Sequence, residues 1–131
     1  MALFDKPDKH WANPHRVKAF QVSWQGFKAL WRQEVNFRLH LALSLIVVIL
    51  GLVFSLDASQ WLWIGLAISL VISSEIINTA LEALVDLLVG DTWHPVAKYI
   101  KDLAALSVVI HSLFALLVGL VIFGPKIFAL F

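Results

Sequence analysis

Three carboxylates and one amide lie along one face of the most hydrophobic part of the chain. In the stretch SSEIINTALEALVD, residues 73–86, the side chains of Glu75, Asn78, Glu82 and Asp86 are spaced by 3, 4 and 4 positions. At about 100° per residue, these spacings put all four within a helical stripe about 80° wide, here called the acidic stripe. Carboxylate and amide oxygens suit Mg²⁺, which often shares its coordination shell with substrate phosphates. The stripe therefore favours a Mg²⁺ site beside bound phosphates.

Glu75 is the member of the stripe that is hardest to explain as a solvated surface residue. A carboxylate at bilayer depth costs roughly 3 kcal/mol or more unless it is paired, protonated or bound to a metal. No Lys or Arg lies within residues 73–86 to pair with it. Glu82 and Asp86 lie nearer the end of the helix, where exposure to water alone would also explain them. The stripe as a whole favours function.

Membrane-spanning helices must position this stripe. The chain has 131 residues, of which 60% are hydrophobic, and its mean hydropathy is +0.85. Three apolar segments, residues 37–56, 61–89 and 98–123, each approach or exceed the roughly 20 residues that cross a bilayer as a helix. The sequence therefore predicts an all-α membrane protein with one domain over residues 1–131.

The ends of the spans carry helix-capping and helix-breaking residues. Asp57 or Ser59 can cap the second span, and GDTWHP at residues 90–95 should end it. Gly124-Pro125 should end the third span. His111, inside the third span, is interpreted as a residue that hydrogen-bonds to a neighbouring helix.

An amphipathic helix is predicted over residues 14–35, starting at Asn13-Pro14. Aromatic and apolar residues recur there at spacings of three and four, and basic and amide residues occupy the other positions. This pattern favours a helix that lies in the membrane interface. The alternative is a water-exposed helix that packs on a partner.

The basic residues predict the orientation in the membrane. Seven of the ten lie at or before position 38, and the connection at residues 57–60 has none. The positive-inside rule then puts the N-terminus and the loop at residues 87–102 in the cytoplasm, and the C-terminus outside. The absence of cysteine excludes disulfides, thiolate metal sites and a cysteine nucleophile. No nucleic-acid partner is expected.

The segment EIINTALEALVD, followed by IKDLAA, resembles the signature of the prokaryotic diacylglycerol kinase family, which includes undecaprenol kinases. The resemblance runs from RVKAFQVSWQGF through the third span. It implies a lipid kinase of the bacterial inner (cytoplasmic) membrane, with an interfacial helix and three transmembrane helices in a homotrimeric bundle. The active sites would lie between protomers on the cytoplasmic side.

The resemblance also implies roles for individual residues. Glu75 would be the general base that takes the proton of the lipid alcohol, and Glu34 and Glu82 would hold Mg²⁺ on the phosphates of ATP. The implied nucleotide-binding residues are Arg16, Glu34, Asn78, Glu82, Asp86, His94, Lys101 and Asp102. The implied lipid-binding residues are Asn36, Phe37, Arg38 and Glu75.

Two segments, EVNFRLH at residues 34–40 and GDTWHPVAK at residues 90–98, resemble the undecaprenol kinase branch of the family. The implied reaction is the conversion of undecaprenol to undecaprenyl phosphate by direct in-line phosphoryl transfer. Diacylglycerol, converted to phosphatidic acid, is the alternative acceptor. Ile100 and Leu106 depart from the family pattern, where smaller residues are usual.

The residues alone leave two alternatives from other classes of protein. One is a small cation or proton channel lined by the acidic stripe, and the other is a structural subunit that uses the stripe for assembly. The acids are confined to one end of the second span, whereas a pore should be polar along its length or have a short hydrophobic gate. The enzyme is therefore favoured.

Overall fold

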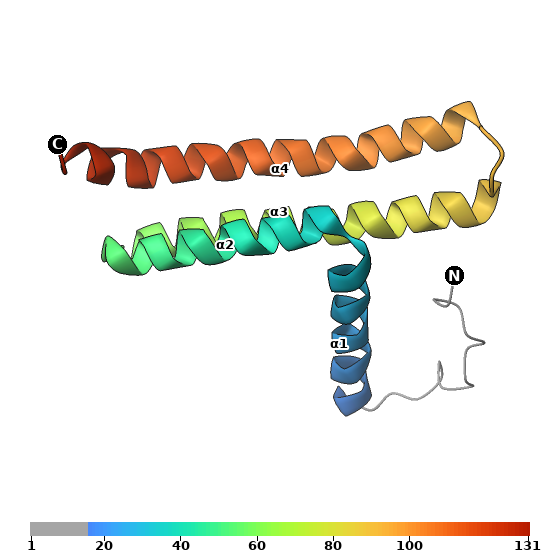
Figure 1. Ribbon diagram of the computed structural model, residues 1–131, viewed down its shortest axis with the longest axis horizontal. Helices are drawn as coiled ribbons and strands as arrows, with labels where there is room; N and C mark the ends of the chain where they lie inside the picture. The colour runs from blue at the N-terminus through green and yellow to red at the C-terminus, as the bar shows by residue number, and fades with distance from the viewer. Residues whose placement is uncertain (1–15) are drawn as a thin grey trace. The chain divides into compact units, whose positions relative to one another are not determined.

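The computed structural model describes residues 16–131, and side chains from Lys18 onward. These residues form four helices: α1 (Arg16–Gln33), α2 (Val35–Val53), α3 (Ala58–Val89) and α4 (Pro95–Phe128) (Figure 1). The chain divides into two compact units, with α1 in one and residues 34–131 forming the other. α2, α3 and α4 are each long and apolar enough to cross a membrane. The all-α class is confirmed, and each predicted span corresponds to a helix that could cross a membrane.

In α1, aromatic rings stack along the helix. The ring of Phe27 lies between those of Trp24 and Trp31, with centroids 5.3 and 6.4 Å apart. The ammonium group of Lys28 lies 5.7 Å from the centroid of Trp24, within cation–π range. The predicted helix start at residues 13–14 lies outside the described residues.

The turn from α2 to α3 is tightly packed. Ser55 adopts a positive φ of 50°, and the N–H of Leu56 donates back to the carbonyl of Gly51. The ring of Trp61 covers Gly51 so closely that a Cβ there would lie 2.7 Å from the nearest ring carbon. Glycine at position 51 therefore allows α2 and the start of α3 to approach each other.

α3 starts with a capping box at Asp57, which decides between the two predicted caps. Its carboxylate accepts from the N–H of Gln60 at 2.9 Å, and the Gln60 side chain accepts from the N–H of Asp57 at 3.2 Å. The helix ends at Gly90, whose φ of 57° suits glycine. With 32 residues it is about 48 Å long, well beyond the ~30 Å of bilayer hydrocarbon.

α4 is longer than the sequence predicted. It starts at Pro95, which needs no intrahelical donor at that position, and it continues through Pro125 to Phe128. The predicted end at Gly124-Pro125 is therefore wrong. Proline removes one backbone hydrogen bond, and a spanning helix can absorb that loss close to its end.

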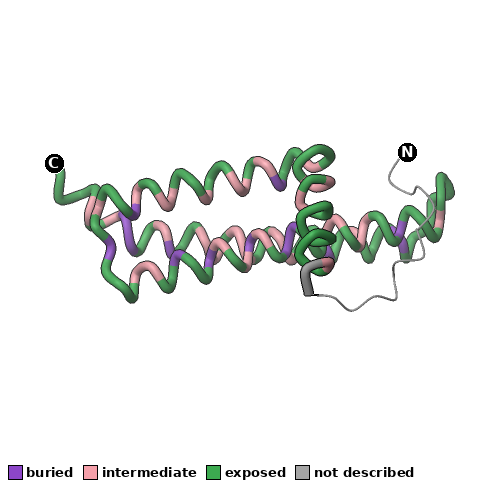
Figure 2. The backbone as a smooth tube through the Cα atoms, turned by 90° about the horizontal axis from the view of Figure 1, so that it is seen from below, coloured by how far each residue is buried: buried purple, intermediate pink, exposed green. Residues whose placement is uncertain are grey.

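Within residues 34–131, α3 and α4 run antiparallel side by side, and α2 packs on the half of α3 nearer to the α2–α3 turn (Figure 1). The apolar core lies at that end, among Leu56, Ile64, Ala67, Val118, Ile122 and Phe123. Elsewhere the buried positions are scattered along the helices (Figure 2). Most apolar side chains of the three helices are exposed. Such surfaces suit contact with lipid or with other helices.

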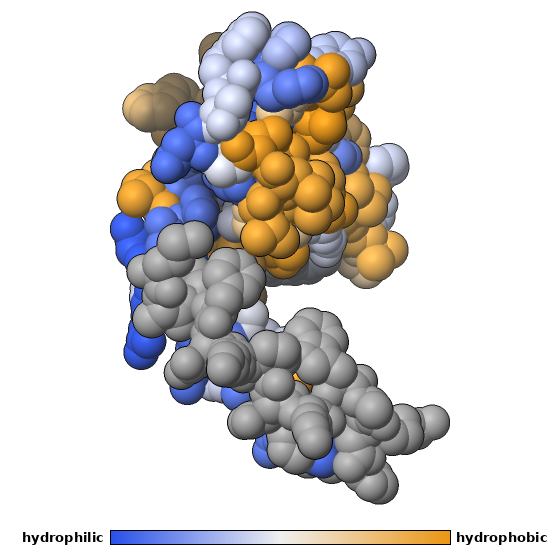
Figure 3. Space-filling model, turned by 90° about the vertical axis from the view of Figure 1, so that its right-hand side faces the viewer, coloured by the Kyte–Doolittle hydropathy of each residue, from blue (hydrophilic) through white to orange (hydrophobic). Residues whose placement is uncertain are grey.

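The opposite end, where α3 turns into α4, extends past the start of α2 (Figure 1). Seen from this end, hydrophilic and hydrophobic side chains are both exposed (Figure 3). Leu87, Leu88 and Trp93 are exposed there, and so are Lys98 and Asp102. This mixture is typical of a membrane–water boundary, where amphipathic and charged side chains gather.

Candidate functional site

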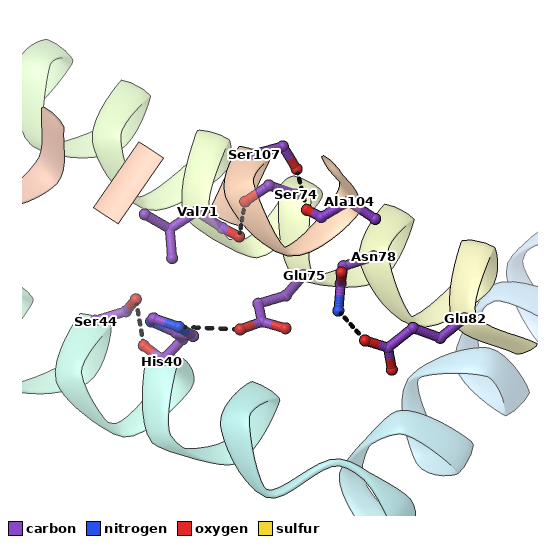
Figure 4. Close-up of polar contacts among 9 residues, drawn as sticks. All are labelled: His40, Ser44, Val71, Ser74, Glu75, Asn78, Glu82, Ala104 and Ser107. Atoms are coloured by element: carbon purple, nitrogen blue, oxygen red, sulfur yellow. Dashed lines mark hydrogen bonds and ion pairs between the residues drawn. The ribbon is translucent and has the colours of Figure 1, made fainter. Parts of the chain in front are cut away.

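Glu75 is buried between α2 and α3. It is only 5% exposed, and its Oε1 lies 3.0 Å from Nε2 of His40 on α2 (Figure 4). The pairing explains how a carboxylate is tolerated here, because a buried acid needs a partner. The neighbouring buried hydroxyl of Ser74 is satisfied within its own helix, by donating to the carbonyl of Val71 at 2.8 Å.

Asn78 and Glu82 form the next part of the acidic stripe, one and two turns further along α3. The amide nitrogen of Asn78 donates to Oε1 of Glu82 at 3.1 Å (Figure 4). The amide oxygen of Asn78 is buried and accepts no hydrogen bond from the described residues. A buried oxygen with free lone pairs can accept from a donor or coordinate a cation.

Glu34 brings a further carboxylate to this region from the start of α2, where it is the N-cap residue. Glu34 and Glu82 both lie near enough to Glu75 for their charges to act on its carboxylate. Among the described residues, no three His, Asp or Glu side chains are close enough to hold a metal ion by themselves. Mg²⁺ needs only one or two carboxylates when waters and phosphates complete its shell, so Glu34 and Glu82 fit that demand.

Asp86, the last member of the stripe, is exposed and pairs with α4 instead. Its Oδ1 lies 2.5 Å from Nζ of Lys101. Lys98 and Asp102 form a second ion pair along α4. These pairs lie on exposed surface, where an ion pair adds little stability and its members can be shared with a charged ligand.

The other predicted site residues lie in varied surroundings. His94 caps α4, and its Nδ1 accepts from the N–H of Val96 at 3.2 Å. Asn36 is exposed and Arg38 half-buried, whereas Phe37 is 2% exposed. Arg16 opens α1, but its side chain lies outside the described residues.

His40 is the residue near Glu75 that the sequence reasoning missed. It lies 17 positions before Asp57 and Glu75 lies 18 positions after it, so an antiparallel pair of helices folded at Asp57 brings them to one level. Two titratable residues at equal depth in adjacent spans can pair, and this pattern in the sequence could have indicated the contact. His111, in contrast, has a buried Nδ1 with no hydrogen bond to any described residue, so its predicted bond to a neighbouring helix is not made by that atom.

An apolar cavity of about 350 Å³ adjoins the pair of His40 and Glu75. α2, α3 and α4 all line it, with His40 among the lining residues and Val47, Ile68, Ala115 and Leu116 forming apolar wall. A pair of titratable side chains thus borders a space suited to hydrocarbon. This arrangement fits a substrate with a polar end and an apolar chain.

Comparison with known proteins gives consistent matches along nearly the whole chain. Residues 21–123 match the model of the family described as prokaryotic diacylglycerol kinase. An undecaprenol kinase from Bacillus subtilis is 38% identical over 110 residues, covering 84% of this chain and 89% of that protein. A diacylglycerol kinase from Synechocystis is 32% identical over 117 residues, covering 89% of this chain and 67% of that protein. A diacylglycerol kinase from Escherichia coli K12 is 31% identical over 101 residues, covering 77% of this chain and 82% of that protein.

The matched range includes His40 and every predicted site residue apart from Arg16. All three relatives are named as kinases, which favours the enzyme over the channel and the structural subunit.

Proposed function

Since the chain belongs to the prokaryotic diacylglycerol kinase family and is a lipid kinase, we propose that it phosphorylates undecaprenol, with ATP as donor and Mg²⁺ as cofactor. The observation that carries the reaction is the buried carboxylate of Glu75 beside an apolar cavity and two further acids. The choice of undecaprenol rests on the likeness to the Bacillus subtilis enzyme.

Glu75 is the proposed general base. It takes the proton of the acceptor hydroxyl while that oxygen forms a bond to the γ-phosphorus of ATP. The bond from this phosphorus to the β–γ bridging oxygen breaks, and ADP leaves with the electron pair. The transfer is direct and in line, so positioning and charge neutralisation supply most of the rate enhancement.

Glu34 and Glu82 are the proposed ligands of Mg²⁺, which would neutralise charge on the phosphates. Asn78 supports this role because its amide holds Glu82 and its free oxygen faces no other donor among the described residues. Lys101 would contact a phosphate by sharing its ammonium group between ATP and Asp86. Asp86 and Asp102 would complete the polar surroundings of the nucleotide, together with His94 and Arg16.

The acceptor lipid would enter from the bilayer with its hydroxyl toward Glu75. The apolar cavity supports this proposal, because His40 both lines it and contacts Glu75. The part of the hydrocarbon chain next to the hydroxyl would then occupy the cavity. Asn36, Phe37 and Arg38, at the start of α2, would contact the head of the lipid.

The proposed setting is the bacterial inner membrane, with the N-terminus and the α3–α4 connection in the cytoplasm, where ATP is available. The early clustering of basic residues supports this orientation. A homotrimer with shared sites, as the resemblance implies, would cover much of the exposed apolar surface of α2–α4. α1 would lie in the membrane interface.

Diacylglycerol is the second candidate acceptor. The relatives from Synechocystis and Escherichia coli, both named diacylglycerol kinases, favour it. The machinery for phosphoryl transfer would be the same, so the two candidates differ only in the lipid.

A transfer assay with γ-³²P-ATP on purified protein in mixed micelles tests the proposal. Undecaprenol and diacylglycerol are offered separately and in competition, with and without Mg²⁺, and with Glu75→Gln as control. We expect label mainly in undecaprenol, dependent on Mg²⁺ and lost in the variant. Preferential label in diacylglycerol would overturn the choice of acceptor, and no label in either lipid would overturn the reaction.

A further inference from the structure

We propose that His40 is a positioning residue, whose Nε2–H holds the carboxylate of Glu75 in the orientation that accepts the proton of the lipid hydroxyl. This inference rests on the proposed role of Glu75 as general base.

The contact uses one of the two oxygens of the carboxylate. Nε2 of His40 lies 3.0 Å from Oε1 of Glu75, a normal hydrogen-bond distance. The second oxygen points away from His40, toward the side where Asn78 and Glu82 lie (Figure 4). A carboxylate held by one oxygen keeps the other available to a substrate.

The link connects two helices, whereas the neighbouring side-chain hydrogen bonds are local. Ser44 donates to the carbonyl of His40 in its own helix at 2.7 Å, and Ser74 donates to Val71 in its own helix. Neither bond restrains Glu75. His40 therefore fixes the carboxylate relative to α2, which also forms part of the apolar wall of the cavity where the acceptor would bind.

The two acids whose charges act on Glu75 do not hold its carboxylate in place. Glu34 and Glu82 both repel its carboxylate, and neither can hold it in place while ionised. His40 supplies an attractive contact on the opposite side from Glu82 (Figure 4). Without it, the side chain of Glu75 would move among rotamers, and small misplacements of a reacting group cost rate.

The test compares variants at position 40 by steady-state kinetics. We expect His40→Leu, which keeps an apolar cavity wall but removes the donor, to lower kcat about 30-fold, because misplacing a catalytic group by about 1 Å can cost about 100-fold. The KM values for ATP and for lipid should stay within about twofold. His40→Gln should recover kcat to within about fivefold of the unmodified enzyme, since its amide can donate from nearly the same point. Ser69→Ala is the control. It removes a hydrogen bond that Ser69 donates to the carbonyl of Gly65 within α3, and it should leave kcat and both KM values unchanged.

A double variant separates this inference from the proposed function. His40→Leu added to Glu75→Gln should cause no further loss of activity, because the two residues would act through one step. Full activity in Glu75→Gln would overturn the role of Glu75 and the inference with it. Loss in Glu75→Gln together with unchanged kcat in His40→Leu would overturn the inference alone. Equal losses of kcat in His40→Leu and His40→Gln, together with dissociation of the oligomer on size exclusion, would assign His40 a structural role. That result would also overturn the inference.

Discussion

The unit formed by α2, α3 and α4 is held together differently at its two ends. At the α2–α3 turn, apolar side chains pack around Ile64 and Phe123, and the Trp61 ring covers Gly51. Toward the α3–α4 connection, the contacts between helices include polar ones, from His40 to Glu75 and from Asp86 to Lys101. Apolar packing aligns the helices at one end, and the other end carries the residues of the proposed site. Substitutions should therefore affect stability at one end and activity at the other.

The largest effect is expected at the polar end. Glu75→Gln should lower kcat by about 1,000-fold, within the range for removing a general acid–base group, because an amide cannot take the proton. The amide oxygen of Gln can still accept from Nε2 of His40, and the repulsion from Glu34 and Glu82 is lost, so the variant should resist unfolding in detergent at least as well as the unmodified protein. Phosphoryl transfer and detergent-induced unfolding, measured on the same preparations, check the expected loss of kcat and the expected stability. Activity that survives, or a protein that no longer folds, would contradict the comparison.

At the apolar end, Gly51→Val should destabilise the protein by about 2 kcal/mol, because the added side chain meets the Trp61 ring and overpacking typically costs that much. The kcat of the protein that remains folded should not change. Gly65→Val is the matched control, since a Cβ at that position meets no atom within 4 Å. Equal destabilisation by both variants would show that the Trp61 contact does not matter.

A smaller effect is expected for Lys101→Met at the polar end. Removing an ammonium group from a phosphate should raise the KM for ATP about tenfold, equivalent to about 1.4 kcal/mol. The KM for the lipid should stay the same. Lys126→Met, near the far end of α4, removes an equal charge and should leave both KM values unchanged. A rise in the KM for the lipid instead would mean that Lys101 contacts the acceptor lipid and not the nucleotide.

The smallest effect is expected at the start of α3. Asp57→Ala breaks the capping box and should cost about 1 kcal/mol of stability without a kinetic change. Ser59→Ala should cost almost nothing, because Ser59 is not the cap. Detergent titration of the two variants side by side measures the difference, and equal costs would contradict the observed cap.

The sequence predicted the features that depend on local patterns. Apolar runs of sufficient length indicated three spans, Asp57 was one of two predicted caps of the second span, and GDTWHP at residues 90–95 was predicted to end it. The stripe on α3 followed from helical periodicity alone. Local rules failed at Pro125, where the helix continues because one lost hydrogen bond does not outweigh the rest of a long helix.

What the sequence did not yield depends on how helices align. The sequence pattern does not single out His40, because its significance comes from Glu75, 35 positions away on another helix. The pairing of Lys101 with Asp86 is likewise a property of side chains in three dimensions. So is the burial of the amide oxygen of Asn78, which accepts no hydrogen bond from the described residues. Periodicity reports which face of a helix a residue occupies, but not what that face meets.

The position of Glu75 along α3 has a consequence for the membrane itself. Glu75 follows Ala58 by 17 residues, or about 26 Å of helix, which is close to the thickness of bilayer hydrocarbon. Thicker bilayers would draw its carboxylate into the hydrocarbon, and thinner ones would bring it toward water. The turn from α2 to α3 fixes the two helices to each other, so the distance from this turn to Glu75 along the membrane normal is constant. The rate of the enzyme should therefore depend on the hydrophobic thickness of the membrane that holds it.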